Sequence, residues 1–391
     1  MKQHLNLILL LMWLPTLSMA QIEYTSKEKE EYYKNREFKE FEPLDEVSIA
    51  NYHDDFFEFV KLDSFVPYGD TIYFTPYQDS IFRVWRPNQN YGIIPQPVKG
   101  TGKIDNSRIL KHDKKGNVEA FVYESSAYED TYYVGIWIAY SEDSGNTWSY
   151  YYTGITQKQP LFIKWYSSHP LINEQGDIQI EACLVRQKSP LFHPLSMESY
   201  QIVKDGLLLT FDLETLCKDS DSDGLTDIVE AKFRTDPNNA DTDNDGVPDN
   251  LDLNPRFAPS RTDKTIIFET IIENNDMISF EELNIPTDEK PEIHYATDET
   301  QTILIVTVDK NLQSIQPKSY RVIILTQKEY ENSPRYFKNE LNKMTISPLF
   351  KVDGENDTYV VNIYFNTWGS GYWAKKTEKT WTIKETFSII E

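Results

Sequence analysis

Short apolar and aromatic runs, separated by turn residues, dominate the first half of the chain. These runs, rich in Ile, Val, Phe, Tyr and Trp, cover residues 71–74, 81–85, 120–123, 133–138, 177–180 and 207–213. Such runs at nearly regular spacing are typical of antiparallel strands joined by turns. Residues 49–216 are therefore predicted to form an all-β domain.

The pattern becomes mixed in the last third of the chain. Further runs typical of strands cover residues 265–268, 302–308, 320–325, 359–365, 371–376 and 380–390. A helical pattern covers residues 327–343, although Pro334 interrupts it. Residues 259–391 are therefore predicted to form an α+β domain that ends in a β-meander.

The N-terminus has the pattern of a segment that directs export. A polar start with Lys2 precedes an apolar run at 5–17, and Ser18-Met19-Ala20 supplies the small residues of a cleavage site. A membrane-spanning helix needs about 20 apolar residues, and neither this run nor any later one is that long. Residues 1–20 are predicted to be a signal peptide, so we expect a periplasmic, secreted or cell-surface protein. Residues 21–48, which are charged and poor in aliphatics, are predicted to form a flexible or loosely helical leader.

The charge of the chain argues against two classes of partner. The formal net charge is −23 and becomes −24 when Lys2 is removed with the signal peptide. Nucleic acids and anionic lipids would be repelled by this surplus, whereas divalent cations would neutralise it. Cys183 and Cys217 leave two alternatives open, a disulfide that an oxidising compartment permits or two buried free thiols.

Two aspartate-rich loops within residues 217–258 have the spacing of calcium ligands. The pattern D-x-D-x-D-G begins at residue 219 and again 22 residues later at residue 241. In such a loop, carboxylates at positions 1, 3 and 5 converge, position 7 offers its carbonyl, and positions 9 and 12 complete the shell around a glycine turn. The candidate ligands are Asp219, Asp221, Asp223, Leu225, Asp227 and Glu230 in the first loop, and Asp241, Asp243, Asp245, Val247, Asp249 and Asp252 in the second.

The donor atoms favour calcium among the common metals. Six or seven hard oxygens at about 2.3–2.6 Å suit Ca²⁺ better than the smaller Mg²⁺. The loops contain neither His nor Cys, which argues against zinc or copper. The predicted cofactor is therefore Ca²⁺, about two ions. Asp252 is shorter by a methylene than Glu230, so the second site is either weaker or completed by a residue outside its loop.

The flanking segments distinguish these loops from a pair of EF-hands. Pro248 and Pro255 exclude a long exiting helix, while four apolar residues between the loops fall on one face of a short helix. These four are Leu225, Ile228, Val229 and Phe233. The run Thr-Asp-Pro-Asn-Asn-Ala-Asp-Thr-Asp-Asn-Asp-Gly at residues 235–246 resembles bacterial thrombospondin type-3 repeats. This resemblance covers about 40 residues and implies that calcium ions form the core of a segment with few apolar residues.

Charge repulsion gives the metal a structural role. Residues 219–252 contain eleven acidic and two basic residues, a net charge of −9, which two dications would reduce to −5. Without metal these charges repel one another and extend the chain. We therefore predict that Ca²⁺ stiffens a spacer between two domains of a non-enzymatic binding or scaffold protein. The expected partner is a protein or glycan at the cell surface, and the alternative for this segment is a solvated acidic linker.

A second motif lies in the N-terminal β region. Residues 141–148, Ser-Glu-Asp-Ser-Gly-Asn-Thr-Trp, resemble the Asp-box, or BNR repeat, of sialidase-type β-propellers. The resemblance implies a propeller-like or stacked antiparallel domain in which the motif is structural. About 170 residues with one clear copy leave room for about four blades. A divergent glycan hydrolase or a glycan-binding lectin is the alternative function.

No catalytic signature accompanies the Asp-box. Arg83, Arg108 and Arg186 would have to converge to form an arginine triad, and scattered surface positions explain them better. The metalloprotease, Walker, nucleophile-elbow and dinucleotide motifs are absent from the sequence. The predicted fold is mainly β and multidomain, with an N-terminal β domain, the short calcium-loop cassette at 217–258 and an α+β C-terminal domain.

Overall fold

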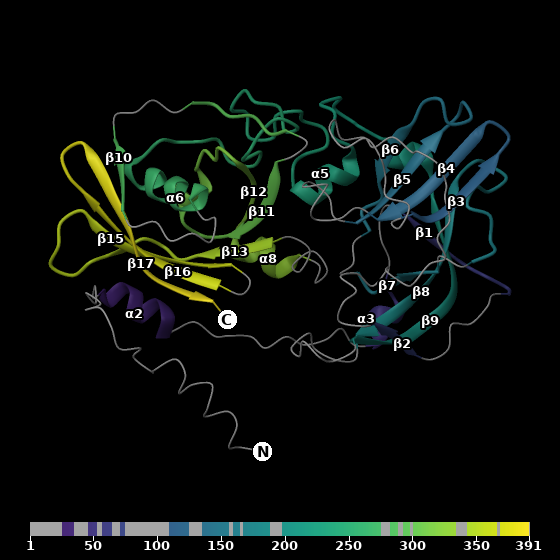
Figure 1. Cartoon of the computed structure of the whole chain (residues 1–391), viewed down its shortest axis with the longest axis horizontal. Coiled ribbons are helices and arrows are strands. Elements are labelled where there is room, and N and C mark those ends of the chain that lie inside the picture. The colour runs from purple at the N-terminus through teal and green to yellow at the C-terminus, as the bar shows by residue number, and fades with distance from the viewer. Residues whose placement is uncertain are drawn as a thin grey trace, which may run out of the picture.

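The described strands form three sheets, none of which closes on itself (Figure 1). The computed structural model describes residues 26–34, 46–52, 57–64, 71–74, 109–124, 135–155, 159–164, 167–187, 198–274, 282–287, 292–297, 300–333, 342–365 and 368–390. Strands outnumber helices over this part of the chain, so the prediction of a mainly β protein is confirmed. Two sheets belong to the first half of the sequence and one larger sheet to the last third.

The four-stranded sheet is an antiparallel meander. Its strands, paired in sequence order, are β3 (Ile109–Lys115), β4 (Val118–Glu124), β5 (Ile136–Ser141) and β6 (Ser149–Tyr152). Neighbouring side chains on a strand point to opposite faces, and both faces are buried here. Val122 and Ile138 belong to the main core, whereas Phe121 and Ala139 form a smaller cluster on the other face.

The second sheet is also antiparallel, and a long strand organises it. Its strands are β1 (Glu58–Lys61), β2 (Thr71–Phe74), β7 (Leu161–Ile163), β8 (Ile178–Gln187) and β9 (Glu198–Phe211). Strand β9 pairs with β8 along one edge and with both β1 and β2 along the other. Helix α3 (Glu46–Ala50) packs on this sheet through the buried Ile49. These pairings confirm the antiparallel strands predicted for this region.

The third sheet is mixed and eight-stranded. Its order is β10-β17-β16-β15-β13-β11-β12, with β14 attached to β15, and β11 runs parallel to both β12 and β13. The strands are β10 (Leu283–Pro286), β11 (Gln301–Val306), β12 (Tyr320–Leu325), β13 (Asn342–Ile346), β14 (Phe350–Lys351), β15 (Thr358–Phe365), β16 (Trp368–Lys376) and β17 (Thr380–Ile390). The prediction of an α+β arrangement ending in a meander agrees with this topology.

One predicted strand of this region is a helix. Residues 265–268 lie inside α6 (Asp263–Glu273), so the strand prediction was wrong. The Thr262 side chain accepts a hydrogen bond from the Thr265 backbone, and the Thr265 side chain accepts one from the Thr262 backbone, which caps the helix. Ile267 and Ile271 are four residues apart and both fully buried, so helical spacing rather than alternation buries the apolar run.

The helix predicted over residues 327–343 is also shorter than expected. Helix α8 (Gln327–Asn332) ends before Ser333, and residues 334–341 lie outside the described part of the chain. From residue 342 the chain is strand β13, so that end of the prediction was wrong. Met344 and Ile346, two residues apart on β13, both point into the core. Pairing with β11 and β15 stabilises this strand.

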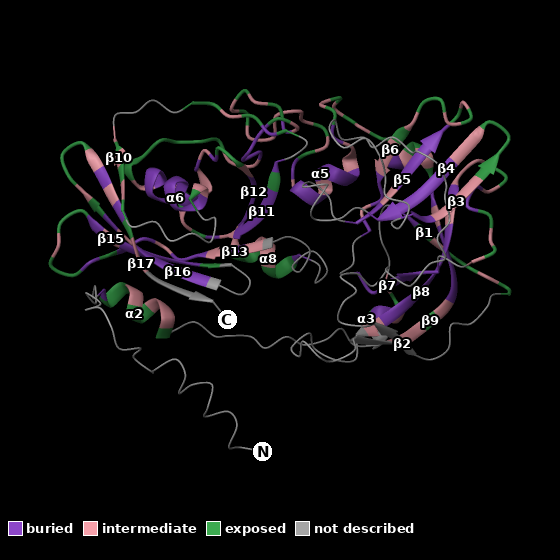
Figure 2. Ribbon diagram, viewed as in Figure 1, coloured by how far each residue is buried: buried purple, intermediate pink, exposed green. Residues whose placement is uncertain are grey.

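Different segments cover the two faces of the mixed sheet (Figure 2). Helices α6 and α7 (Lys310–Gln313) bury one face together with Ile303 and Ile305 of β11. The intervening Leu304 points to the other face and contributes to a different cluster. On that face, α5 (Asp227–Phe233) covers β11 and β12.

Helix α2 (Lys27–Lys34), within the expected leader, also packs on the mixed sheet. The rings of Tyr32 and Tyr33 lie 5.3 and 6.4 Å from the ring of Phe350. The amide of Asn362 donates a hydrogen bond to the Tyr33 hydroxyl at 3.0 Å. This part of the leader is therefore a docked helix, with α2 and α6 on opposite sides of the sheet (Figure 1).

Helix α5 joins the two halves of the molecule. Ile228 and Phe233 are buried in one continuous core that includes Tyr152 of β6 and Ile323 of β12. In Figure 1, α5 lies between the sheets of the first half and the mixed sheet. The segment between the predicted domains therefore packs against both of them.

Both cysteines are free thiols. Cys183 is buried in β8, whereas Cys217 follows α4 (Leu213–Leu216) and is exposed. Burial raises the pKa of the Cys183 thiol to about 12, so this thiol stays protonated at neutral pH. The structure thus agrees with free thiols, but the expected burial holds for Cys183 and was wrong for Cys217.

Some predictions concern residues outside those described. They are the signal peptide at 1–20, the run at 81–85, and Arg83 and Arg108. Among the described helices, none has the length and apolar character that crossing a bilayer requires.

Truncating Phe233 tests whether α5 belongs to the shared core. We expect Phe233→Ala to lower the free energy of unfolding by about 3–5 kcal/mol, the usual loss for a fully buried aromatic side chain. Guanidinium denaturation followed by tryptophan fluorescence measures it. Val308→Ala is the control, because that side chain is 70% exposed and should cost less than about 0.5 kcal/mol. Equal losses for the two variants would contradict the packing of α5.

Candidate metal centre

Backbone hydrogen bonds close both aspartate-rich loops in the same way. In the first loop Asp219 accepts hydrogen bonds from the backbone of Ser222 at 2.8 Å and Gly224 at 3.1 Å. In the second, Asp241 accepts one from the backbone of Gly246 at 2.9 Å. Gly224 and Gly246 have φ values of +100° and +98°, a backbone conformation that residues with a Cβ atom rarely adopt. The sixth position of each loop therefore requires glycine.

The carboxylates at positions 1, 3 and 5 converge in each loop. Within each set, one oxygen per residue lies within 4.8 Å of the others. The sets are Asp219, Asp221 and Asp223 in the first loop, and Asp241, Asp243 and Asp245 in the second. The backbone N–H groups at position 7 bond to the carboxylates at position 5. Leu225 donates to Asp223 at 2.7 Å, and Val247 donates to Asp245 at 2.8 Å. The two loops thus have closely similar geometry.

The acidic residue at position 12 of each loop is buried. Glu230 is fully buried on α5, and Asp252 is only 8% exposed. Each has one buried carboxylate oxygen for which the described residues provide no hydrogen-bond donor, as do Asp221 and Asp243 at position 3. An ionised carboxylate that is buried without a partner is strongly unfavourable. These four oxygens therefore need either protons or a cation.

The electrostatics of the loops agree with that requirement. Burial, followed by the charges of Asp221 and Asp223, raises the pKa of Glu230 to about 8. Burial and the charge of Asp245 raise the pKa of Asp243 to about 7. Burial likewise raises the pKa of Asp252 to about 6. Burial is the largest cause of each shift, and neighbouring carboxylates of the two loops add to it, so each position-12 group lies beside other acidic side chains.

The ninth position of each loop has a different role. Both oxygens of Asp227 accept hydrogen bonds, from the backbone and hydroxyl of Ser220 and from Lys218. Burial favours a raised pKa for Asp227, but these hydrogen bonds outweigh it and lower the pKa. Asp249 likewise accepts from the backbone of Thr242 at 3.0 Å and from its hydroxyl at 2.7 Å. In both loops the position-9 carboxylate is bonded to the residue at position 2, which fixes the loop.

Asn250, which connects the two loops by a hydrogen bond, was not among the residues predicted from the sequence. The Asn250 backbone in the second loop donates to Asp223 in the first at 3.1 Å. Nothing in the sequence marks Asn250, because its contribution comes from the backbone. By contrast, the hydroxyls of Ser220 and Thr242 occupy the same position in both loops and could have been found by aligning them.

Donor chemistry and geometry fit a hard dication. Each loop offers convergent carboxylate oxygens and a buried carboxylate at position 12, with no nitrogen or sulfur donor in the loop. Such an all-oxygen set suits Ca²⁺ or Mg²⁺ rather than a soft metal.

The Asp-box forms a tightly bonded turn between β5 and β6. Asp143 accepts hydrogen bonds from the Thr147 backbone at 2.8 Å and the Thr147 hydroxyl at 2.7 Å, which lower its pKa to about 2. The Trp148 indole donates to the Gly145 carbonyl at 3.0 Å. The Ser141 hydroxyl accepts from the Gly145 backbone at 2.9 Å. The motif residues therefore hold the turn itself.

No protein-family model, curated protein or solved structure matches the chain. Of the arginines considered above, Arg186 lies half-buried at the end of β8, and the other two are outside the described residues.

The raised pKa values predict how metal-free stability depends on pH. Where folding raises a carboxyl pKa, the stabilisation is complete below the usual value, 4.5 for Glu230, and is lost as the pH rises to the folded value of about 8. In chelator we therefore expect a melting temperature that falls between pH 4.5 and 8, and a smaller fall for Glu230→Gln. Excess Ca²⁺ should remove most of the fall in the unaltered protein. Identical pH profiles with chelator and with Ca²⁺ would argue against a metal at these carboxylates.

Proposed function

We propose that the two loops bind two Ca²⁺ ions and that the protein is an exported, non-enzymatic binding or scaffold protein. The observation that carries this proposal is the pair of buried position-12 carboxylates, Glu230 and Asp252, each with an oxygen that lacks a donor among the described residues. A calcium ion would supply the positive charge that these oxygens need. The repeated loop geometry supports one ion in each loop.

Glu230 links the first loop to the shared core. Its carboxylate closes the first loop, and its backbone is part of α5. Ile228 and Phe233 on the same helix fill the core between the two halves. Repulsion between Glu230 and the loop aspartates would pull this helix out of position if their charges were not balanced. We infer that calcium orders α5 and thereby the interface.

The cassette acts as a joint between the flanking regions. Lys232 donates a hydrogen bond to the Tyr152 hydroxyl in β6 at 3.0 Å. On the other side, the Val322 backbone in β12 donates to the Leu253 carbonyl at 2.8 Å. The spacer expected from the sequence is therefore proposed to hold its neighbours in contact, and calcium to stiffen that contact.

We further propose that the N-terminal β region is built from propeller-like blades. Support comes from the four-stranded meander and from the Asp-box turn between its last two strands. Because the Asp-box residues bond to their own turn, they give no reason to assign glycan hydrolysis. A protein or glycan at the cell surface is the partner class that an exported scaffold would bind.

Isothermal titration with Ca²⁺ tests the metal sites. We expect about two ions per chain, and at least a tenfold weaker affinity at the altered loop for Glu230→Gln or Asp252→Asn, because each removes a charged ligand. Glu174→Gln, a change of the same charge in an exposed turn, is the matched control and should bind normally. Equilibrium dialysis that detects no bound ion at millimolar Ca²⁺ would refute the proposal.

Limited trypsin digestion tests the ordering of α5. Lys232 is only 7% exposed, so calcium-loaded protein should resist cleavage there and chelated protein should be cut. Cleavage after Lys115, exposed in the hairpin between β3 and β4, serves as the internal control and should not respond to calcium. Equal cleavage at Lys232 in chelator and in calcium would show that the metal does not order the joint.

A further inference from the structure

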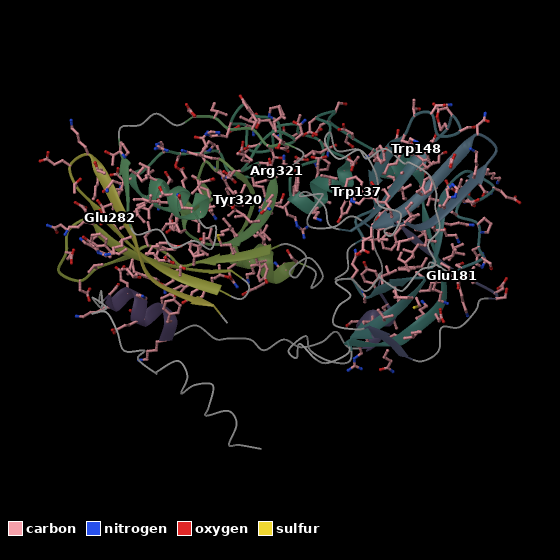
Figure 3. The ribbon with its side chains drawn as sticks, in the orientation of Figure 1. Trp137, Trp148, Glu181, Glu282, Tyr320 and Arg321 are labelled. Carbon is pink, nitrogen blue, oxygen red and sulfur yellow. The ribbon has the colours of Figure 1, made fainter. Side chains whose placement is uncertain are left out.

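A buried arginine of the mixed sheet lies against the second aspartate-rich loop and against α5, the helix that carries the last residues of the first loop. Arg321, labelled in Figure 3, is on β12 and is fully buried. It donates a hydrogen bond to the Asn250 carbonyl in the second loop at 2.6 Å. Its guanidinium also lies 4.6 Å from the centre of the Phe233 ring, at the end of the helix that follows the first loop. One side chain thus contacts structural elements of both loops.

Asn250 extends this contact into the first loop. While its carbonyl accepts from Arg321, its backbone N–H donates to the Asp223 carboxylate. A shift of the second loop therefore moves an acceptor of Arg321 and a donor to Asp223 together. The three residues form a continuous path of charge-assisted hydrogen bonds from β12 to the first loop.

The two clusters of acidic residues also act on each other directly. Asp249 of the second loop is 1% exposed and directly precedes Asn250, whose backbone N–H donates to the Asp223 carboxylate of the first loop at 3.1 Å. A cation in either loop would thus relieve repulsion in both, which favours binding of the second ion.

We propose that Arg321 is a positioning residue that couples the two calcium loops to each other and to the mixed sheet. This inference rests on the proposed calcium binding of the loops. Arg321 holds Asn250 where it can bridge to Asp223, and it binds no ion itself. The two sites then fill cooperatively, and filling them docks β12 against the cassette.

A neighbouring arginine provides a matched control. Arg256 donates to the Arg234 carbonyl at 3.0 Å, to the Ile324 carbonyl and to Glu329 at 2.6 Å. It therefore also ties the cassette to the mixed sheet, but none of these partners belongs to either loop. Losing Arg256 should weaken the interface without changing the coupling between ions.

The coupling is measured by calcium titration of the full mature chain. In the parent protein, Glu230→Gln in the first loop should weaken calcium binding by the second loop about tenfold, within the usual range of coupling. In an Arg321→Met background the same change should weaken it less than about twofold. Arg256→Met should retain the full tenfold effect. Arg321→Lys, which keeps the charge but not the planar fork, should give an intermediate value.

Each outcome separates the two proposals. Absence of any bound calcium in the parent protein would overturn the proposed function itself. Two bound ions with full coupling in Arg321→Met would overturn only the role of Arg321. If Arg321→Met does not fold, Glu230→Gln in the parent protein still decides, because an unchanged second site there would rule out coupling. Circular dichroism of each variant establishes whether it is folded.

Discussion

Repulsion between carboxylates that are partly withdrawn from water is the constraint on which the rest of the structure depends. Two clusters of aspartates, each closed by a buried acid at its twelfth position, lie beside an apolar core. Like charges in such surroundings cost several kcal/mol unless they are protonated or bound to cations. The fold buries these groups nonetheless, since the helix that carries Glu230 also carries the apolar side chains of the joint.

That double use of α5 explains how a segment of largely polar sequence can join two larger parts. The helix is only seven residues long and would not be stable alone. Its apolar face obtains a core from both neighbours, and its first turn is tied to the loop that precedes it. The helix needs both its apolar contacts and the acidic loop. The core fixes the helix only if the acidic loop can fold back beside it.

Local sequence patterns predicted the elements that are held by contacts between residues close together in the chain. Short apolar and aromatic runs between turn residues predicted the strands of the first half, and the spacing of Asp and Gly predicted loops whose residues bond within their own turn. The apolar run at 265–268 was ambiguous, because four such residues suit a strand or a buried helix equally, and the cap at Thr262 decides. Docking of α2 and the bridge through Asn250 depend on residues far apart in the chain, which no local pattern reveals.

The register of β12 determines both how the sheet packs and which side chain reaches the acidic loops. Val322 and Ile324 face the core under α6, so Arg321, Ile323 and Leu325 must face α5. Ile323 and Leu325 are apolar and join the shared core. Arg321 instead donates a hydrogen bond to the Asn250 carbonyl in the second acidic loop. An apolar residue at 321 would leave the Asn250 carbonyl without this donor. The alternation that builds the sheet therefore also places the Arg321 guanidinium beside the second acidic loop.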